Sequence, residues 1–186
     1  MHAVTTELQP SVRLHILRCG ERLVAAKGFV GVGLAEILAA AGVPKGSFYH
    51  YFGSKERFGE ALLAQYLERY LAQVDTLLQP DDAGTPARVR LMRYWSYWNV
   101  SQCGIATAGA PADGCANDAA GARCLIVKLS AEVADMSEPM RLALRRGTDD
   151  IVQRIDQCLQ DCQNEGALPA NADTAALALT LYELWL

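Results

Sequence analysis

The chain has 186 residues, of which 51% are hydrophobic and 20% charged, and its formal net charge is −4. This composition excludes an intrinsically disordered chain and supplies enough apolar side chains for a buried core. Residues 1–60 hold seven Lys or Arg and five Asp or Glu, a net of +2, whereas residues 61–186 hold ten and sixteen, a net of −6. This division is typical of a small nucleic-acid-binding head joined to a larger acidic body.

The N-terminus carries neither a basic stretch nor an apolar run, and no window of the chain is apolar enough to span a membrane. We therefore expect a cytoplasmic protein without membrane contact. In that compartment its six cysteines are expected to be thiols: Cys19, Cys103, Cys115, Cys124, Cys158 and Cys162. The sequence has no CxxC pair, HExxH segment or histidine cluster, so we expect neither a metal site nor a cofactor.

Apolar residues recur with helical spacing along nearly the whole chain, which predicts an all-α fold. Gly28, Gly42 and Gly53 end the first three expected helices, and Ser54 can cap the fourth. In this N-terminal part we expect helices over 11–27, 34–41, 45–51 and 54–78.

The C-terminal part is divided by a polar linker over 79–86 and by an Ala- and Gly-rich stretch over 104–122, which predicts a loop. Helices are expected over 87–102, 123–134, 138–164 and from about 173 to 186. The last of these is apolar nearly all round, and such a helix has to be buried against another surface. We expect it to form a homodimer, together with residues that would follow Leu186.

The segment from Leu34 to Lys55 reads LAEILAAAGVPKGSFYHYFGSK, and two short helices around a Gly-containing turn are typical of a helix-turn-helix. Phe48 and Phe52, four residues apart, are expected to anchor the second helix. Ammonium and hydroxyl groups suit DNA phosphates and base edges. Such groups gather in this short segment, which predicts a DNA-binding face: Lys45, Ser47, Tyr49, His50, Tyr51 and Lys55. The alternative is an amphipathic helix whose tyrosines only pack.

The stretch AGVPKGSFYHYFGSKE resembles the TetR family of bacterial repressors, over roughly residues 13–65. The resemblance implies a three-helix DNA-binding head over 1–55 and an all-helical regulatory and dimerisation domain over 56–186. It implies a homodimer on double-stranded DNA with an inverted-repeat operator. It also implies that Lys55 binds a phosphate and that five residues face DNA: Lys45, Gly46, Ser47, Tyr49 and Tyr51. One departure is Gly33, where the family often has a Thr that caps the second helix.

A second block, RCLIVKLSAEVADMSEPMR from Arg123, resembles the branch of this family that responds to N-ethylmaleimide and senses electrophiles and oxidants. The resemblance makes Cys124 the sensing thiol. Arg123, Lys128 one turn on and a nearby helix start all favour a thiolate there. The local sequence equally fits a buried, unreactive cysteine. Cys103 is a second sensor candidate, whereas packing explains the rest of the helical cysteines, Cys19, Cys158 and Cys162.

We therefore expect a transcriptional repressor that an electrophile or oxidant releases from its operator through a cysteine. A second interpretation is release by reversible binding of a small molecule in a helical pocket. Four aromatic residues of one expected helix either line such a pocket or pack in the core: Tyr94, Trp95, Tyr97 and Trp98. A third interpretation is a helical small-molecule-binding protein without DNA function. No constellation of catalytic residues is visible, so we do not expect an enzyme.

Overall fold

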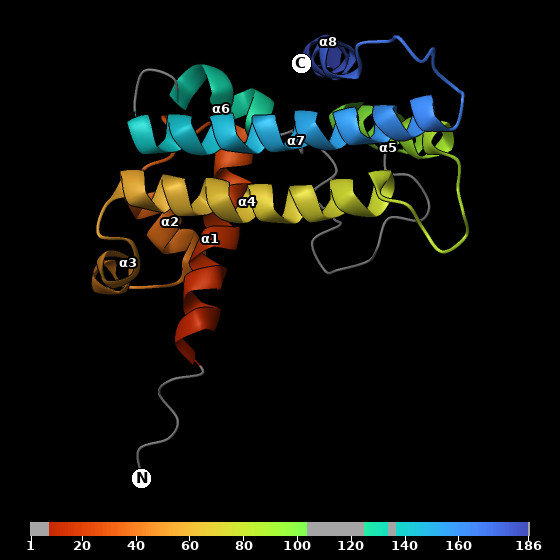
Figure 1. Cartoon of the computed structure of the whole chain (residues 1–186). Coiled ribbons are helices and arrows are strands. Elements are labelled where there is room, and N and C mark those ends of the chain that lie inside the picture. Colours follow the sequence, from red (N-terminus) through yellow and green to blue (C-terminus); the bar gives the residue numbers. More distant parts are fainter. Residues whose placement is uncertain (1–7, 104–124, 134–136, 186) are drawn as a thin grey trace. The chain divides into compact units, whose positions relative to one another are not determined.

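The computed structural model describes residues 8–103, 125–133 and 137–185, and every element within these ranges is an α-helix (Figure 1). The predicted all-α class is therefore confirmed. No helix in these ranges is both long enough and apolar enough to cross a membrane. The helices are α1 (Leu8–Lys27), α2 (Leu34–Ala41), α3 (Lys45–Phe52), α4 (Lys55–Leu78), α5 (Ala87–Cys103), α6 (Leu125–Val133), α7 (Glu138–Asn164) and α8 (Thr174–Trp185).

Contacts divide the chain into two compact units. Unit 1 comprises Met1–Tyr66 and Gly121–Ala143, and unit 2 comprises Leu67–Ala120 and Leu144–Leu186. These units are defined by contacts, and the boundary between DNA-binding and regulatory domains at residue 55 stays a prediction. Unit 1 takes in the first half of α4, all of α6 and the first residues of α7.

In unit 1 the glycines that end helices do so by adopting positive φ angles. Gly42 follows α2 with φ 63°, and its N–H donates to the Ala39 carbonyl, which closes the last turn. Pro44 then precedes α3 in an extended conformation. The hydrophobic core of this unit is completely or almost completely buried and is made chiefly of Ile16, Leu17, Val24, Ile37, Phe48, Phe58, Ile126, Leu129 and Met140.

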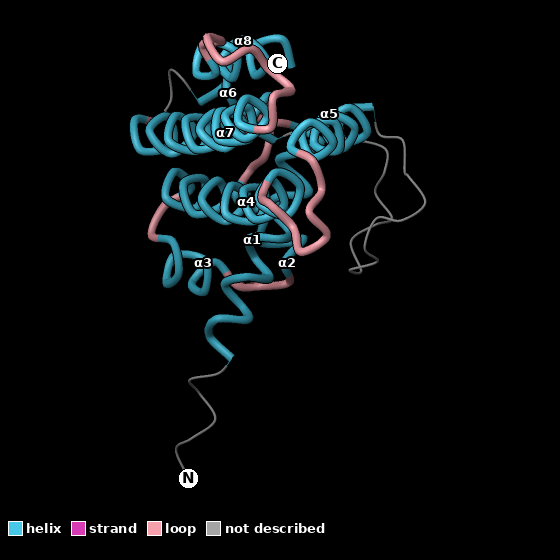
Figure 2. The backbone as a smooth tube through the Cα atoms, turned by 45° about the vertical axis from the view of Figure 1, so that its right-hand side comes forward, coloured by secondary structure: helices cyan, strands magenta, loops and turns pink. Residues whose placement is uncertain are grey.

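In unit 2 the second half of α4 and most of α7 run side by side in the same direction (Figures 1 and 2). Gly147 permits their close approach, because a Cβ there would collide with the Leu67 side chain. Further along, Arg154 of α7 binds both carboxylate oxygens of Asp75, at 2.7 and 3.2 Å. On α8, Ala178 is buried, whereas three leucines are exposed on this chain: Leu177, Leu179 and Leu184.

Candidate nucleic-acid interface

The inner face of α3 is formed by Phe48 and Phe52, as predicted. Both rings are at most 5% exposed and pack on Phe58 of α4, with centroid separations of 5.3 and 5.1 Å. Ring pairs at such distances gain stabilisation beyond the area that they bury. Arg13 of α1 also covers Phe52, with its guanidinium carbon 5.5 Å from the ring centroid. Through this face α3 therefore packs on α4 and α1.

The outer face of α3 carries the residues that the sequence assigned to DNA. Lys45, Gly46, Tyr49 and His50 are exposed, and Ser47 and Tyr51 are half-buried. The Lys45 ammonium lies 5.7 Å from the centre of the Tyr49 ring, which is 44% exposed. The alternative in which the tyrosines only pack therefore does not describe Tyr49. Because α3 contains no acidic residue, this face presents cations and hydroxyl groups without a carboxylate among them.

The start of α4 contributes the remaining predicted DNA residue. Ser54 caps the helix, as expected, by accepting the Arg57 N–H at 3.2 Å. Lys55 is half-buried, and its ammonium donates to the Phe29 carbonyl at 3.0 Å and lies 4.8 Å from the centre of the Phe29 ring. An ammonium has three N–H donors, so this bond leaves donors that can reach a phosphate. Its predicted phosphate contact stays a prediction.

Two residues of α6 contact the end of α1, and sequence reasoning missed this connection. Glu132 accepts the backbone N–H groups of Phe29 and Val30 through one oxygen, at 2.7 and 3.1 Å. Lys128 donates to the Ala26 carbonyl at 2.9 Å and to the Ala25 carbonyl as well. The sequence also suggested Lys128 as a cation for Cys124, which lies outside the described residues.

The cysteines fall into two groups. Cys19, Cys158 and Cys162 are buried, which confirms that they are packing residues. Burial raises the pKa of the Cys158 thiol to about 12, with Cys162 as a further contribution, and burial likewise raises the pKa of Cys162. Burial therefore disfavours the reactive thiolate form of both residues at neutral pH. Of the sensor candidates, Cys103 is the last residue of α5, and Cys124, like Cys115, lies outside the described residues.

The aromatic residues of α5 differ in their surroundings. Tyr94 is buried, and its hydroxyl pairs with that of Tyr70 at 3.2 Å, so this residue belongs to the core. Trp95, Tyr97 and Trp98 are half-buried, and the two indoles stack with centroids 6.0 Å apart.

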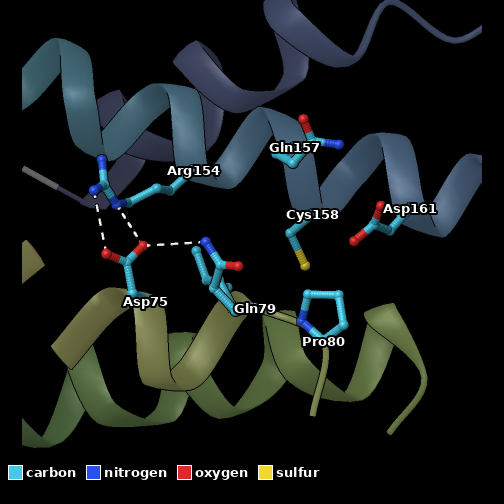
Figure 3. Close-up of a pocket in the computed structure, with 8 residues that line it drawn as sticks. Asp75, Gln79, Pro80, Arg154, Gln157, Cys158 and Asp161 are labelled. Atoms are coloured by element: carbon cyan, nitrogen blue, oxygen red, sulfur yellow. Dashed lines mark hydrogen bonds and ion pairs between the residues drawn. The ribbon is translucent and has the colours of Figure 1, made fainter. Parts of the chain in front are cut away.

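A small hollow in unit 2 is lined by other residues. Arg154 and Asp75 pair on one side of it, and Cys158 points toward Pro80 on the other (Figure 3). Its lining contains none of the four α5 aromatics and no aromatic residue at all. The hollow therefore gives no support to a pocket built from the α5 rings.

Both the N-terminal and the C-terminal part of the chain match models of known protein families. Residues 16–62 match the family model described as bacterial regulatory proteins, tetR family, and residues 105–186 match the tetracyclin repressor-like C-terminal domain. The chain is 37% identical to the HTH-type transcriptional repressor NemR of Escherichia coli K12, over 94% of this chain and 80% of that protein. It is 31% identical to the transcriptional regulator AcuR of Cereibacter sphaeroides, over 91% of this chain and 71% of that protein.

Among solved structures, the reduced form of E. coli NemR superimposes with a TM-score of 0.74 at 36% identity, covering 94% of this chain and 84% of that one. These matches confirm the family resemblance that the segments around Lys45 and Cys124 predicted. The matches extend the resemblance from the helix-turn-helix segment to nearly the whole chain.

Proposed function

The chain belongs to the tetR family of bacterial regulatory proteins, and from this premise we propose a sequence-specific DNA-binding repressor that leaves its operator when an electrophile or oxidant modifies Cys124. Membership in a family of transcription regulators also agrees with the expectation that the protein is not an enzyme. The observation that carries the DNA-binding part is the outer face of α3, where Lys45, Tyr49 and His50 are exposed above a helix anchored by buried rings.

The proposed partner is a double-stranded operator with inverted half-sites, bound by a homodimer whose two α3 helices enter successive major grooves. Lys45 and Ser47 are assigned to base edges. Lys55, with the hydroxyl groups of Tyr49 and Tyr51, is assigned to phosphates, and Gly46 lets the backbone of α3 approach DNA because its α-carbon faces open space. His50 is exposed beside them and adds a donor.

The sensing part is supported by the likeness to NemR and by the place of Cys124 next to α6. Leu125, the first residue of α6, donates its N–H to the Tyr66 hydroxyl of α4 at 3.3 Å. The adjoining apolar side chains, Leu125 and Ile126, are 2% exposed. Oxygen or a maleimide added at the preceding residue would bring volume and polarity to a closely packed helix start. We propose that α6 shifts, that α4 tilts with it, and that the two heads then no longer match their half-sites.

The test is a gel shift with operator DNA selected from random sequences, before and after N-ethylmaleimide. Wild type should dissociate on treatment, and Cys124→Ser should stay bound. Cys103→Ser tests the second sensor candidate, and it should respond like wild type if Cys124 is the switch. If Cys124→Ser dissociates as readily as wild type, Cys124 is not the switch. A response to N-ethylmaleimide retained when both cysteines are replaced would point to another thiol, with Cys115 to be replaced next. Release that persists without these three cysteines would favour binding near Trp95 and Trp98, whose stacked indoles are half-buried.

A further inference from the structure

The contact between α6 and the end of α1 replaces two hydrogen bonds that α1 would make if it continued. The last regular bond at this end runs from the Gly28 N–H to the Val24 carbonyl, at 2.8 Å. The next two donors would be Phe29 and Val30, and the matching acceptors four residues earlier are Ala25 and Ala26. Glu132 binds both of these donors, and Lys128 binds both of these acceptors.

The pairing of charges suits the groups that are bound. Carbonyls at the C-terminal end of a helix carry partial negative charge and favour a cation such as Lys128. The N–H groups that follow favour a carboxylate. Because Lys128 and Glu132 are four residues apart, both side chains extend from one face of α6. Gly28 has φ 79°, and a Cβ there would collide with the Glu132 carboxylate, so glycine is needed for the approach.

Phe29 connects this contact to the DNA-binding face. Its N–H is held by Glu132 of α6, and its carbonyl accepts from Lys55, the first residue of α4. The Phe29 side chain is 2% exposed and lies against Gly59 of α4, so the residue cannot easily turn away. A relay of hydrogen bonds therefore runs from the Glu132 carboxylate through the peptide group that joins Phe29 to Val30 and on to the Lys55 ammonium.

We propose that Glu132 is a positioning residue for DNA binding, which fixes the Lys55 ammonium for a phosphate by holding Phe29. This inference rests on the proposed phosphate contact of Lys55. Glu132 is a carboxylate, so simple repulsion from DNA predicts that its removal strengthens binding. The relay predicts the opposite, because release of Phe29 frees Lys55 from its position and the phosphate contact is lost.

The experiment measures the affinity of the selected operator between 50 and 200 mM salt for wild type, Glu132→Ala, Lys55→Ala and the double variant. A lost phosphate contact lowers the slope of log affinity against log salt by about 0.9. We expect this decrease in both single variants, with a roughly tenfold loss of affinity at fixed salt, which is what one charged contact typically contributes. The double variant should match Lys55→Ala alone, because both substitutions remove the same contact.

Two further variants separate positioning from simple structural support. Glu132→Gln keeps an oxygen that can accept both N–H groups, which wild type binds through one carboxylate oxygen, so it should retain most of the affinity. Glu138→Ala is the charge-matched control, because it also removes one carboxylate. Glu138 is exposed, and its described ion pair is with Arg141 of the same helix, α7. This control variant should leave the salt slope unchanged.

Amide hydrogen exchange at Phe29 and Val30 gives a readout that does not depend on DNA. Exchange at these amides should be faster in Glu132→Ala than in wild type or Glu138→Ala. The thermal stability of the other helices should be the same in all three proteins. Unchanged exchange at these two amides would overturn the proposal. If the two losses of affinity add in the double variant and Glu132→Ala keeps the wild-type salt slope, the relay alone is overturned. An unchanged slope in Lys55→Ala would overturn both the relay and the phosphate contact on which it rests.

Discussion

The guanidinium of Arg90 donates to the Asp161 carboxylate at 2.9 Å from a position that is only 3% exposed. A second nitrogen of the same guanidinium donates to the Leu78 carbonyl, at the end of α4. One cation of α5 thereby caps α4 and binds α7, and all three residues belong to unit 2. Taking such a charge out of water is costly unless its partners are in place.

Replacing Asp161 by Ala should destabilise the protein by about 3–5 kcal/mol, because the Arg90 charge would then be buried without its carboxylate. Urea denaturation followed by circular dichroism measures the change. Asp149→Ala is the control, since Asp149 and its partner Arg145 are both 72% exposed. The control should unfold at the wild-type midpoint. Equal midpoints for the two variants would contradict the structural role of the Arg90 pair.

The buried thiol of Cys158 predicts a loss of stability in alkali. Its pKa is raised from 9.0 to about 12 by burial, so the folded protein keeps a proton that the unfolded chain releases above about pH 9. The stabilisation is complete below pH 9 and declines as the pH rises toward 12, by up to about 1.4 kcal/mol per pH unit. Urea titrations between pH 8 and pH 11 should show this slope in wild type and a smaller one in Cys158→Ala. Parallel slopes in the two proteins would exclude Cys158 as the group responsible.

Local patterns were sufficient for the helices and for the face of α3. The spacing of Phe48 and Phe52 identified the side that packs, and the structure places both rings on Phe58. Ser54 was recognisable as a helix cap because its partner, the Arg57 N–H, is three residues away. Features of this kind can be predicted because all their parts lie within one or two helical turns.

The contact between α6 and α1 could not be predicted in the same way. Glu132 and Phe29 are 103 residues apart in the chain, and Lys128 and Ala26 are 102 apart. The sequence around Lys128 gives no sign that its ammonium binds carbonyls of α1, a helix that lies about a hundred residues earlier in the chain. Periodicity likewise identifies α4 as one helix without showing which of its residues pack in which unit.

Base recognition should depend on Lys45 and Ser47, which lie in the first turn of α3. Lys45→Ala or Ser47→Ala should relax the preference at particular base pairs, by about 1–3 kcal/mol where a base edge is contacted. Selection from random DNA followed by sequencing reports the preference at each position. Arg88→Ala, an exposed cation of α5, is the control and should return the wild-type site. The assignment of this face fails if the Lys45 and Ser47 variants select that same site unchanged.

The exposed leucines of α8 predict a dimer interface. Leu179 is 49% exposed and Leu184 is 75% exposed in the isolated chain, which leaves an apolar surface for a second copy to cover. Wild type should therefore sediment as a dimer at micromolar concentration, whereas Leu179→Lys combined with Leu184→Lys should sediment as a monomer. The monomer should also bind the operator far more weakly, because a single head reaches only one half-site.

Val89→Lys tests whether any exposed apolar residue has this effect, since Val89 of α5 is 43% exposed but lies outside α8. This variant should remain a dimer and bind DNA like wild type, because a lysine at position 89 is expected to face solvent in the monomer and in the dimer. Sedimentation of wild type as a stable monomer would contradict the interface outright. Dissociation of Val89→Lys, with the α8 variant still dimeric, would instead move the interface from α8 to α5.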